Sequence, residues 1–359
     1  MARPSQARLD LAALRHNIGH ARSLAPHSKV MAVVKANAYG HGAVTIAQTL
    51  EPLADALAVT SIDEALELRA AEITAPILLL EGIFEESELA IAARENFWLC
   101  IDNDWQIGCL ERQALEQSIQ VWLKIDTGMH RLGITPERAD GAYKRLKNSK
   151  NVADDIILCT HFGCADELEN TRTQQQIDCF NRVCETLPGA RSAANSAGLL
   201  GWPGSHFDWI RPGYMLYGNS PFAVPHDNTQ ALQPVMTLSS AIISIRDIKV
   251  GESVGYGASW TASRPSRIAT VTIGYGDGYP RRARNGTPVL VNGQRASLAG
   301  RVSMDMISVD VTDLKDVKLG DEVILWGKGL PVAEIAECAD TIGYELTTRM
   351  PARTPRLTA

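Results

Sequence analysis

Short apolar runs alternate with longer amphipathic stretches between residues 30 and 211, a pattern that few folds accommodate. It is typical of repeated strand–helix units, in which each buried strand is followed by a helix that covers it. Eight runs predict strands, at residues 30–34, 56–60, 77–80, 97–101, 121–125, 156–159, 191–194 and 209–211. Helices are predicted between them, at residues 43–50, 61–71, 85–94, 105–116, 136–148 and 172–187, and a capping box at Ser61 and Glu64 is expected to start the second of these. Eight parallel strands with crossover helices close most simply into a (β/α)8 barrel of the TIM type.

The pattern changes after residues 220–233, a segment rich in Pro, Asn, His and Thr that is typical of a linker. Five β-rich, roughly alternating runs follow, at residues 236–245, 267–273, 288–291, 306–311 and 322–326. Asn292-Gly293 between apolar flanks predicts a tight hairpin, and a helix is predicted near residues 332–339. The sequence therefore predicts an α/β protein of two domains, with residues 1–228 as the barrel and residues 229–359 as a mostly β C-terminal domain.

The charge balance disfavours some classes of partner. Lys and Arg number 35 against 41 Asp and Glu, a net charge of −6, whereas nucleic-acid binding needs clustered cations. The apolar runs are far shorter than the ~20 residues that a membrane helix needs. Residues 1–10 lack the apolar stretch of a secretory signal. We therefore expect a cytoplasmic protein that binds neither nucleic acid nor a membrane.

The seven cysteines form an odd set without a CxxC pair, which is typical of reduced thiols. Cys159, His161, Cys164 and Asp166 lie close together in the sequence, but their spacing matches no common zinc pattern. We expect a buried strand that ends in a polar loop there, and no metal.

Polar residues follow several of the predicted strands, where a barrel builds its active site. Lys35 ends the first apolar run. Partial desolvation there would lower its pKa and make its amine a nucleophile, although a lysine at a strand end is more often simply solvated. Residues 195–198 and 211–214 place small residues, hydroxyls and backbone N–H groups after the last two strands, where barrels commonly bind a phosphate. Together with Arg211 they indicate pyridoxal 5′-phosphate, with its aldehyde bonded to Lys35.

Residues 33–42, VVKANAYGHG, resemble the pyridoxal-lysine motif of the alanine racemase family. Further agreement with that family lies at residues 124–133, 160–162, 195–197, 211–213, 254–257, 273–278 and 300–306. Other pyridoxal proteins of barrel fold share the lysine motif in a looser form. The GYG and SMD segments of the second domain distinguish alanine racemases from those other proteins. The resemblance extends over essentially the full chain.

The resemblance implies a racemisation of alanine by two acid/base groups, since a proton leaves one face of Cα and another returns on the opposite face. It assigns Lys35 to one face and Tyr256 to the other. His161 and Arg211 are implied to lie behind Tyr256, where cations would lower the pKa of the phenol. Arg211 is also implied to face the ring nitrogen of the cofactor. Because arginine does not release its proton, that nitrogen would stay unprotonated.

The same resemblance implies the remaining site residues. Arg131 would pair with the substrate carboxylate, which the backbone N–H of Met304 would also meet, and Tyr275 would lie on the substrate side. The phosphate contacts would be Tyr39, Ser196, Gly213 and Tyr214. Taken singly, Arg131 as surface charge and Met304 as core packing are the simpler interpretations.

Members of the family act as head-to-tail homodimers with shared active sites, so Tyr256 would serve the Lys35 of the partner chain. Lys124 matches a position that some members carry as a carbamate. Many members have a tyrosine at the position of Ala352 that contributes to the phosphate site. Its absence predicts a more open entrance and a less strict preference for alanine.

Other functions remain open on the sequence alone. A pyridoxal-dependent amino acid decarboxylase of the same fold would normally use a cysteine of the second domain, where Cys338 is the only one. An amino acid racemase of broader specificity, a non-catalytic pyridoxal carrier and a metal-dependent hydrolase barrel are further alternatives. If the chain racemises alanine, it would supply D-alanine for peptidoglycan or serve alanine catabolism.

Overall fold

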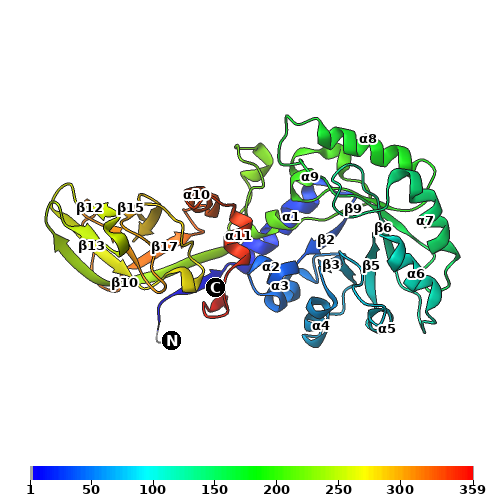
Figure 1. The fold of residues 1–359 in the computed structure, drawn as a ribbon, viewed down its shortest axis with the longest axis horizontal. Coiled ribbons are helices and arrows are strands. Elements are labelled where there is room, and N and C mark those ends of the chain that lie inside the picture. The colour runs from blue at the N-terminus through cyan, green and yellow to red at the C-terminus, as the bar shows by residue number, and fades with distance from the viewer. Residues whose placement is uncertain (1–2, 359) are drawn as a thin grey trace.

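The computed structural model describes residues 3–358 as an elongated molecule with a barrel at one end and a β domain at the other (Figure 1). The barrel has eight parallel strands: β2 (Lys29–Val33), β3 (Ala56–Val59), β4 (Ile77–Leu79), β5 (Phe97–Ile101), β6 (Val121–Lys124), β7 (Ile157–Cys159), β8 (Arg191–Ser192) and β9 (Trp209–Ile210). They pair in chain order, and β9 closes the barrel against β2. Every strand lies where the alternation of the sequence predicts one, so the predicted (β/α)8 fold is confirmed.

Helices cover the outside of the barrel or lie in the loops that follow its strands. They are α1 (Leu11–Leu24), α2 (Lys35–Tyr39), α3 (Ala43–Leu50), α4 (Ile62–Ala70), α5 (Glu88–Arg94), α6 (Asp104–Arg112), α7 (Pro136–Asn148), α8 (Arg172–Cys184) and α9 (Ser196–Gly201). In α7, Pro136 occupies the first turn and the buried side chains recur at helical spacing, at Ala139, Ala142, Tyr143 and Leu146. The helix α1 was not predicted. It begins at Asp10, whose side chain accepts a hydrogen bond from Ala13 N at 2.9 Å.

Large aromatic side chains fill part of the barrel interior. The rings of Trp98, Trp122 and Trp209 lie 5.5 to 6.4 Å apart, and Lys29 sits over the Trp209 ring at the start of β2. Because this cluster occupies the barrel axis, open space is left at the carboxyl ends of the strands. Within residues 3–358 no helix is both long and apolar enough to span a lipid bilayer.

The second domain is built on an eight-stranded sheet in the order β13-β16-β15-β14-β17-β10-β1-β18. Its strands are β1 (Gln6–Leu9), β10 (Met236–Ile248), β13 (Ser266–Val271), β14 (Pro288–Val291), β15 (Gln294–Leu298), β16 (Ile307–Asp310), β17 (Glu322–Trp326) and β18 (Arg356–Thr358). A separate ribbon pairs β11 (Ser253–Val254) with β12 (Trp260–Thr261), and the helices are α10 (Val332–Cys338) and α11 (Gly343–Thr348). Asn292 and Gly293 adopt φ of 49° and 78° between β14 and β15, which confirms the predicted hairpin.

The first strand of the chain lies in this second sheet. β1 pairs antiparallel with β10 and parallel with β18, so both described ends of the chain meet in the β domain (Figure 1). The division at residues 228 and 229 stays a prediction. Within it, Gln6–Leu9 belong by their hydrogen bonds to the sheet of the C-terminal domain.

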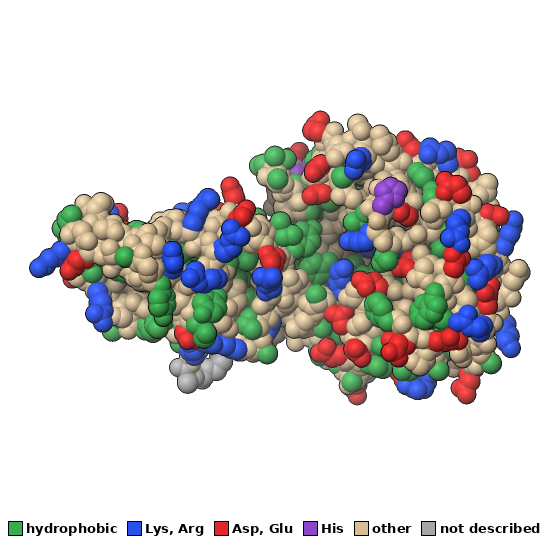
Figure 2. All heavy atoms as spheres, in the orientation of Figure 1, with side chains coloured by type: hydrophobic (Ala, Val, Ile, Leu, Met, Phe, Trp, Pro, Cys, Tyr) green, Lys and Arg blue, Asp and Glu red, His purple; other side chains and the backbone are tan. Residues whose placement is uncertain are grey.

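The loops contain short 3₁₀ turns: η1 (Pro203–Ser205), η2 (Tyr214–Tyr217), η3 (Asp227–Thr229), η4 (Tyr256–Ala258) and η5 (Tyr275–Asp277). Three of them carry tyrosines that the sequence assigns to the site. Figure 2 shows the surface hollowed where the barrel meets the β domain, with hydrophobic side chains gathered in the hollow.

Candidate active site

A cavity of about 590 Å³ opens at the carboxyl ends of the barrel strands, within the usual range of small-molecule sites. It brings together eight residues that the sequence assigns to the site: Lys35, Tyr39, Arg131, His161, Ser196, Arg211, Gly213 and Tyr214. Glu81, Cys100, Trp122, Lys124 and Cys159 also line it. These last five were not predicted as cofactor or substrate contacts, and only Lys124 lay in a motif that resembled the family.

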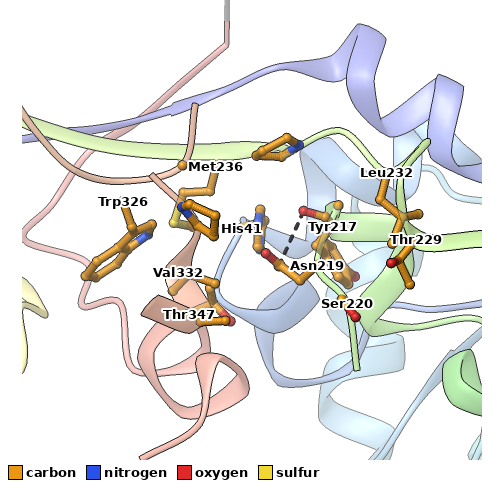
Figure 3. A pocket seen from close by; sticks show the side chains of 15 residues that line it. His41, Tyr217, Asn219, Ser220, Thr229, Leu232, Met236, Trp326, Val332 and Thr347 are labelled. Carbon is orange, nitrogen blue, oxygen red and sulfur yellow. Dashed lines mark hydrogen bonds between the residues drawn. The ribbon is translucent and has the colours of Figure 1, made fainter. Parts of the chain in front are cut away.

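A second cavity of about 230 Å³ lies between the two domains, beside His41, Tyr217 and Trp326 (Figure 3). Its lining contains no Lys, Arg, Asp or Glu side chain. The barrel cavity, in contrast, is lined by Lys35, Lys124, Arg131, Arg211 and Glu81, which can bind charged substrate groups.

Lys35 begins a strained turn. The next four residues, from Ala36 to Tyr39, all have φ of 52° or 53°, so α2 winds with the left hand. That conformation costs roughly 1–2 kcal/mol per non-glycine residue. Polar contacts offset the cost: Glu64 accepts a hydrogen bond from Ala36 N at 2.6 Å, and Asn37 Oδ1 accepts one from Ala43 N at 2.7 Å.

The predicted capping box at Ser61 and Glu64 is wrong. The Ser61 side chain makes no capping hydrogen bond to α4. The Glu64 carboxylate instead accepts from Thr60 N at 2.8 Å and from Ala36 N of the neighbouring unit. The contact that Glu64 makes is tertiary, and it fixes the start of the lysine loop.

The Lys35 amine has an altered protonation equilibrium. Burial lowers its pKa from 10.5, and the cations Arg131 and Lys124 add to this, whereas the carboxylates Glu81 and Glu64 oppose it. A larger fraction of Lys35 is therefore uncharged at neutral pH than of an exposed lysine, which suits a nucleophile or a base.

Ser196, Gly213 and Tyr39 line one part of the cavity together, and we call their arrangement the Ser196–Gly213 cradle. Ser196 Oγ accepts hydrogen bonds from Gly213 N at 3.0 Å and Met215 N at 3.2 Å, which leaves the Ser196 hydroxyl proton to donate. A Cβ atom at position 213 would lie 2.5 Å from Tyr39 Oη, so only glycine permits this approach. Burial raises the pKa of Tyr39 to about 12, so that its hydroxyl is a donor at neutral pH.

Arg211 is buried at the end of β9, and its terminal nitrogens already have partners. Its Nη1 donates to Ser192 Oγ at 2.5 Å, and its Nη2 donates to Thr160 O at 2.6 Å. Among the acceptors of residues 3–358, none binds Arg211 Nε. The guanidinium is thus rigidly held, and two of its five N–H groups, the one on Nε and the second on Nη1, have no acceptor within residues 3–358.

His161 is held neutral beside Arg211. Burial, followed by the positive charge of Arg211, lowers the pKa of His161 well below 6.5. Gln176 of α8 fixes this loop, because its Nε2 donates to His161 O at 3.0 Å and its Oε1 accepts from Gly163 N at 3.0 Å. No sequence pattern pointed to Gln176, a buried polar residue in the middle of a helix.

The Arg131 loop is shaped by Asp126. Its Oδ1 accepts from Gly128 N and from His130 N, both at 3.0 Å, and its Oδ2 lies 3.1 Å from His130 Nδ1. The Arg131 side chain is exposed at the mouth of the cavity, where a bidentate cation can meet a carboxylate.

Tyr344 of α11 is a site residue that sequence reasoning missed. Its ring stacks on Tyr214 with centroids 3.5 Å apart, and Tyr344 and Thr348 both line the cavity. Ala352 is exposed and is not among the lining residues. Tyr344 thus forms part of the cavity wall, and the more open entrance expected from Ala352 stays a prediction.

Three predicted site residues do not reach this cavity. Tyr256, Tyr275 and Met304 all lie in the β domain, with 68%, 42% and 52% of their surface exposed. Tyr275 N donates to Ser303 O at 3.0 Å, which places Tyr275 and Met304 in neighbouring loops. Large apolar side chains this exposed are suited to meeting another molecule.

Among the described residues no group of three or more His, Cys, Asp or Glu side chains is placed to hold a metal ion. All seven cysteines are free.

Comparison with known proteins decides the family. A family model described as "Alanine racemase, N-terminal domain" matches residues 9–221, and one described as "Alanine racemase, C-terminal domain" matches residues 235–358. The chain belongs to the alanine racemase family. The predicted family and enzyme class, an amino acid racemase, are therefore confirmed.

Individual family members agree over nearly the whole length. The alanine racemase of Chromohalobacter salexigens is 50% identical over 356 residues, which cover 99% of this chain and 98% of that protein. The biosynthetic alanine racemase of Escherichia coli K12 is 50% identical over 342 residues, 95% of each chain. The crystal structure of the biosynthetic alanine racemase of Pseudomonas aeruginosa superposes with a TM-score of 0.96 at 48% identity and covers 99% of each chain.

Proposed function

We propose that this protein interconverts L-alanine and D-alanine with pyridoxal 5′-phosphate, using Lys35 and the partner's Tyr256 as the two proton-transfer groups. One observation carries the proposal: Lys35, with its lowered pKa, shares a cavity with Arg211 and the Ser196–Gly213 cradle, whereas Tyr256 is exposed on the other domain. The family membership supports the reaction, and the separation of the two residues supports a shared site.

The cavity residues fit the cofactor. The glycine-only approach at Gly213 and the free Ser196 proton suit a phosphate, with Tyr39 and Tyr214 as further donors. The unpartnered Arg211 Nε suits a ring nitrogen that accepts a hydrogen bond, and the Lys35 amine suits the aldehyde. When bound, pyridoxal 5′-phosphate supplies electron withdrawal that weakens the Cα–H bond of the amino acid.

The residues of this chain then divide the remaining work. The uncharged Lys35 amine takes up a proton at one face of Cα and the phenol of the partner's Tyr256 delivers one at the other; in the reverse direction the phenolate takes up the proton and the Lys35 ammonium delivers it. Arg131 binds the substrate carboxylate at the mouth of the cavity, together with the backbone N–H of Met304 from the partner. Since His161 is neutral, Arg211 is the cation of this pair.

A homodimer follows from this division, because one chain holds Lys35 and the other presents Tyr256, Tyr275 and Met304. Free cysteines in an odd number favour a cytoplasmic location. D-alanine supply for peptidoglycan, or alanine catabolism, is the corresponding physiological role.

Two alternatives use the same cofactor. In the decarboxylase alternative Cys338 would act, but it lies in α10 and is not among the residues that line the cavity. A racemase of broader specificity needs more room at the mouth, which Tyr344 and Thr348 restrict.

The test is incubation of the purified protein, supplied with pyridoxal 5′-phosphate, with L-alanine in heavy water. Loss of optical rotation with deuterium at Cα is the expected result. Release of carbon dioxide would support the decarboxylase, and label incorporation without loss of chirality would contradict the two-face mechanism.

A further inference from the structure

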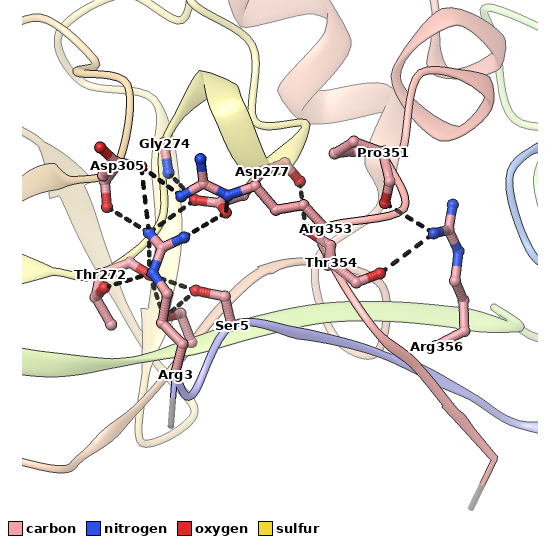
Figure 4. A network of polar contacts seen from close by, with 11 residues as sticks. Arg3, Ser5, Thr272, Gly274, Asp277, Asp305, Pro351, Arg353, Thr354 and Arg356 are labelled. Atoms are coloured by element: carbon pink, nitrogen blue, oxygen red, sulfur yellow. Dashed lines mark hydrogen bonds and ion pairs between the residues drawn. The ribbon is translucent and has the colours of Figure 1, made fainter. Parts of the chain in front are cut away.

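A buried carboxylate joins two arginines in the β domain (Figure 4). Asp277, at the end of η5, is 1% exposed. Its Oδ1 lies 2.7 Å from Arg3 Nη1 and 2.8 Å from Arg353 Nε, and its Oδ2 accepts from Arg3 Nη2 at 3.0 Å. The same Oδ2 accepts from Gly274 N at 2.9 Å, so the carboxylate is also part of the turn.

The two arginines continue to a second carboxylate. Arg353 Nη2 pairs with Asp305 Oδ1, and Arg3 Nη2 donates to Asp305 O at 2.9 Å. Arg3 also donates from Nε to Thr272 Oγ1 at 3.3 Å. Two cations and two carboxylates therefore tie together the start of the chain, its last loop, and the loops around residues 274–277 and 303–305.

The tied loops are the ones that carry Tyr275 and Met304. Gly276 N donates to Met304 O at 2.8 Å, beside the bond from Tyr275 N to Ser303 O. A Cβ at Gly274 would lie 2.2 Å from Ser303 O, so the two loops pack with no free space. The Met304 N–H has no acceptor among the hydrogen-bonding groups of residues 3–358, and the residue is 52% exposed.

We propose that Arg353, together with Arg3, is a positioning residue for substrate binding: it holds Asp277 and Asp305 so that Tyr275 and the Met304 N–H are preorganised for the partner's cavity. The inference rests on the proposed function and deepens it. An N–H that must meet a carboxylate in another subunit loses binding energy if its loop moves, since such hydrogen bonds depend steeply on distance and angle.

Arg353 can be removed without stranding a buried charge. Arg3 still pairs with Asp277 in its absence, and Arg353 itself is 42% exposed. The Arg353–Asp305 pair is exposed on both sides and contributes little to folding, and the buried Asp277 keeps its pair with Arg3 and its hydrogen bond from Gly274 N. Loss of Arg353 is therefore expected to loosen the two loops more than it destabilises the chain.

The experiment compares Arg353→Ala with Arg295→Ala in the holoenzyme. Arg295 makes an exposed bidentate pair with Glu334, on β15 and α10 of the same domain, and is the matched control. In Arg353→Ala the KM for L-alanine and for D-alanine should rise about tenfold, as for a lost hydrogen bond to a charged group, with kcat changed less than about twofold. Arg353→Lys keeps the charge but lacks the planar fork whose Nε and Nη2 reach the two carboxylates, so its KM should lie between those of wild type and Arg353→Ala.

A second readout needs no catalysis. Amide hydrogen exchange of the peptides that contain Tyr275, Gly276 and Met304 should become faster in Arg353→Ala and not in Arg295→Ala. Unchanged KM, or unchanged exchange in these peptides, overturns the inference. If the wild-type protein fails to racemise alanine, the proposed function is wrong. The exchange measurement still tests separately whether Arg353 holds the loops that carry Tyr275 and Met304.

Discussion

At the scale of single residues, His41 shows how the lysine loop constrains protonation. Its side chain is 1% exposed, and its Nδ1 lies 3.0 Å from both Ala38 O and Tyr39 O. Burial lowers the pKa of His41 to about 4, although these carbonyls oppose the shift. The imidazole that closes the left-handed turn is therefore neutral wherever the protein is folded at ordinary pH.

This predicts a pH dependence of stability. The unfolded imidazole gains its proton near pH 6.5 and the folded one only near pH 4, so the stability due to neutral His41 is full above pH 6.5 and is lost as the pH falls towards 4. Between pH 7 and pH 5, protonation of His41 in the unfolded state lowers the free energy of unfolding by about 2 kcal/mol.

This change in the free energy of unfolding can be measured by urea unfolding at pH 7 and pH 5. The proteins compared are wild type, His41→Asn and the exposed His27→Asn. His41→Asn should lose about 2 kcal/mol less than wild type over this interval, and His27→Asn controls for the loss of an imidazole as such. Equal losses in wild type and His41→Asn would contradict the assignment.

Gly213 makes a second prediction at this scale. In Gly213→Ala the new methyl group would push the Tyr39 hydroxyl out of the cradle, because it would lie 2.5 Å from Tyr39 Oη. Overpacking of this kind costs about 1–3 kcal/mol, so the Kd for pyridoxal 5′-phosphate should rise about tenfold.

Absorbance titration of the cofactor-free protein gives that Kd. Gly204→Ala, where the added Cβ has open space, should titrate like wild type. An unaltered Kd for pyridoxal 5′-phosphate in Gly213→Ala would contradict the assignment of Gly213 to the phosphate site.

At the scale of elements, α11 of the β domain packs directly on the lysine loop of the barrel. The Gly40 φ is +81°, and a Cβ there would lie 1.8 Å from Thr347 O. Arg356 reinforces the contact, because its Nε and Nη2 donate to Gly40 O at 3.1 and 3.0 Å. The same helix delivers Tyr344 to the cavity, so the position of α11 sets one wall of the site.

Gly40→Ala should therefore destabilise the protein by about 2–5 kcal/mol, the sum of a left-handed alanine and a steric clash. Gly251→Ala is the matched control: its φ is +86°, but a Cβ there meets nothing within 4 Å. It should cost only the conformational part, about 1–2 kcal/mol. Thermal or urea unfolding measures the stability of the two variants. Equal losses of stability in Gly40→Ala and Gly251→Ala would argue against close packing of α11 on the lysine loop.

The elements also show what a sequence can reveal. Barrel strands and the hairpin at Asn292-Gly293 were predictable because alternation and turn chemistry are local. The roles of Glu64 and Gln176 were not predictable, because neither a capping motif nor a glutamine in the middle of a helix indicates which residue of another strand–helix unit it will contact. The cavity residues of the barrel came from strand ends and from the family motifs, whereas Tyr344 arrives on α11, whose approach depends on tertiary packing.

At the scale of the whole molecule, the chain is elongated, with the barrel and the β domain at opposite ends (Figure 1). The cavity with Lys35 lies at the barrel, whereas Tyr256 lies in η4 of the β domain. A lone chain should therefore be nearly inactive, and complementation tests this. Lys35→Ala and Tyr256→Ala chains should each be inactive, but refolding them together should restore about a quarter of wild-type activity, since half of randomly formed dimers are mixed and each mixed dimer has one intact site.

Racemisation of alanine by the separate and the mixed samples is the measurement. Mixing Lys35→Ala with a Lys35→Ala, Tyr256→Ala double variant is the control, because no pairing then supplies the amine. Absence of complementation in the first mixture would place both groups in one chain.

The placement of β1 in the C-terminal sheet bears on how a ribosome makes this protein. Ala7 and Leu9 are buried only once β10 and β18 flank them, and β18 ends at residue 358. A nascent chain thus exposes its leading strand while all eight barrel strands are synthesised behind it, and contacts so remote in sequence form late. The barrel strands can pair during translation, whereas the sheet of the β domain closes only after β18 has been synthesised, so this domain completes its fold after the barrel.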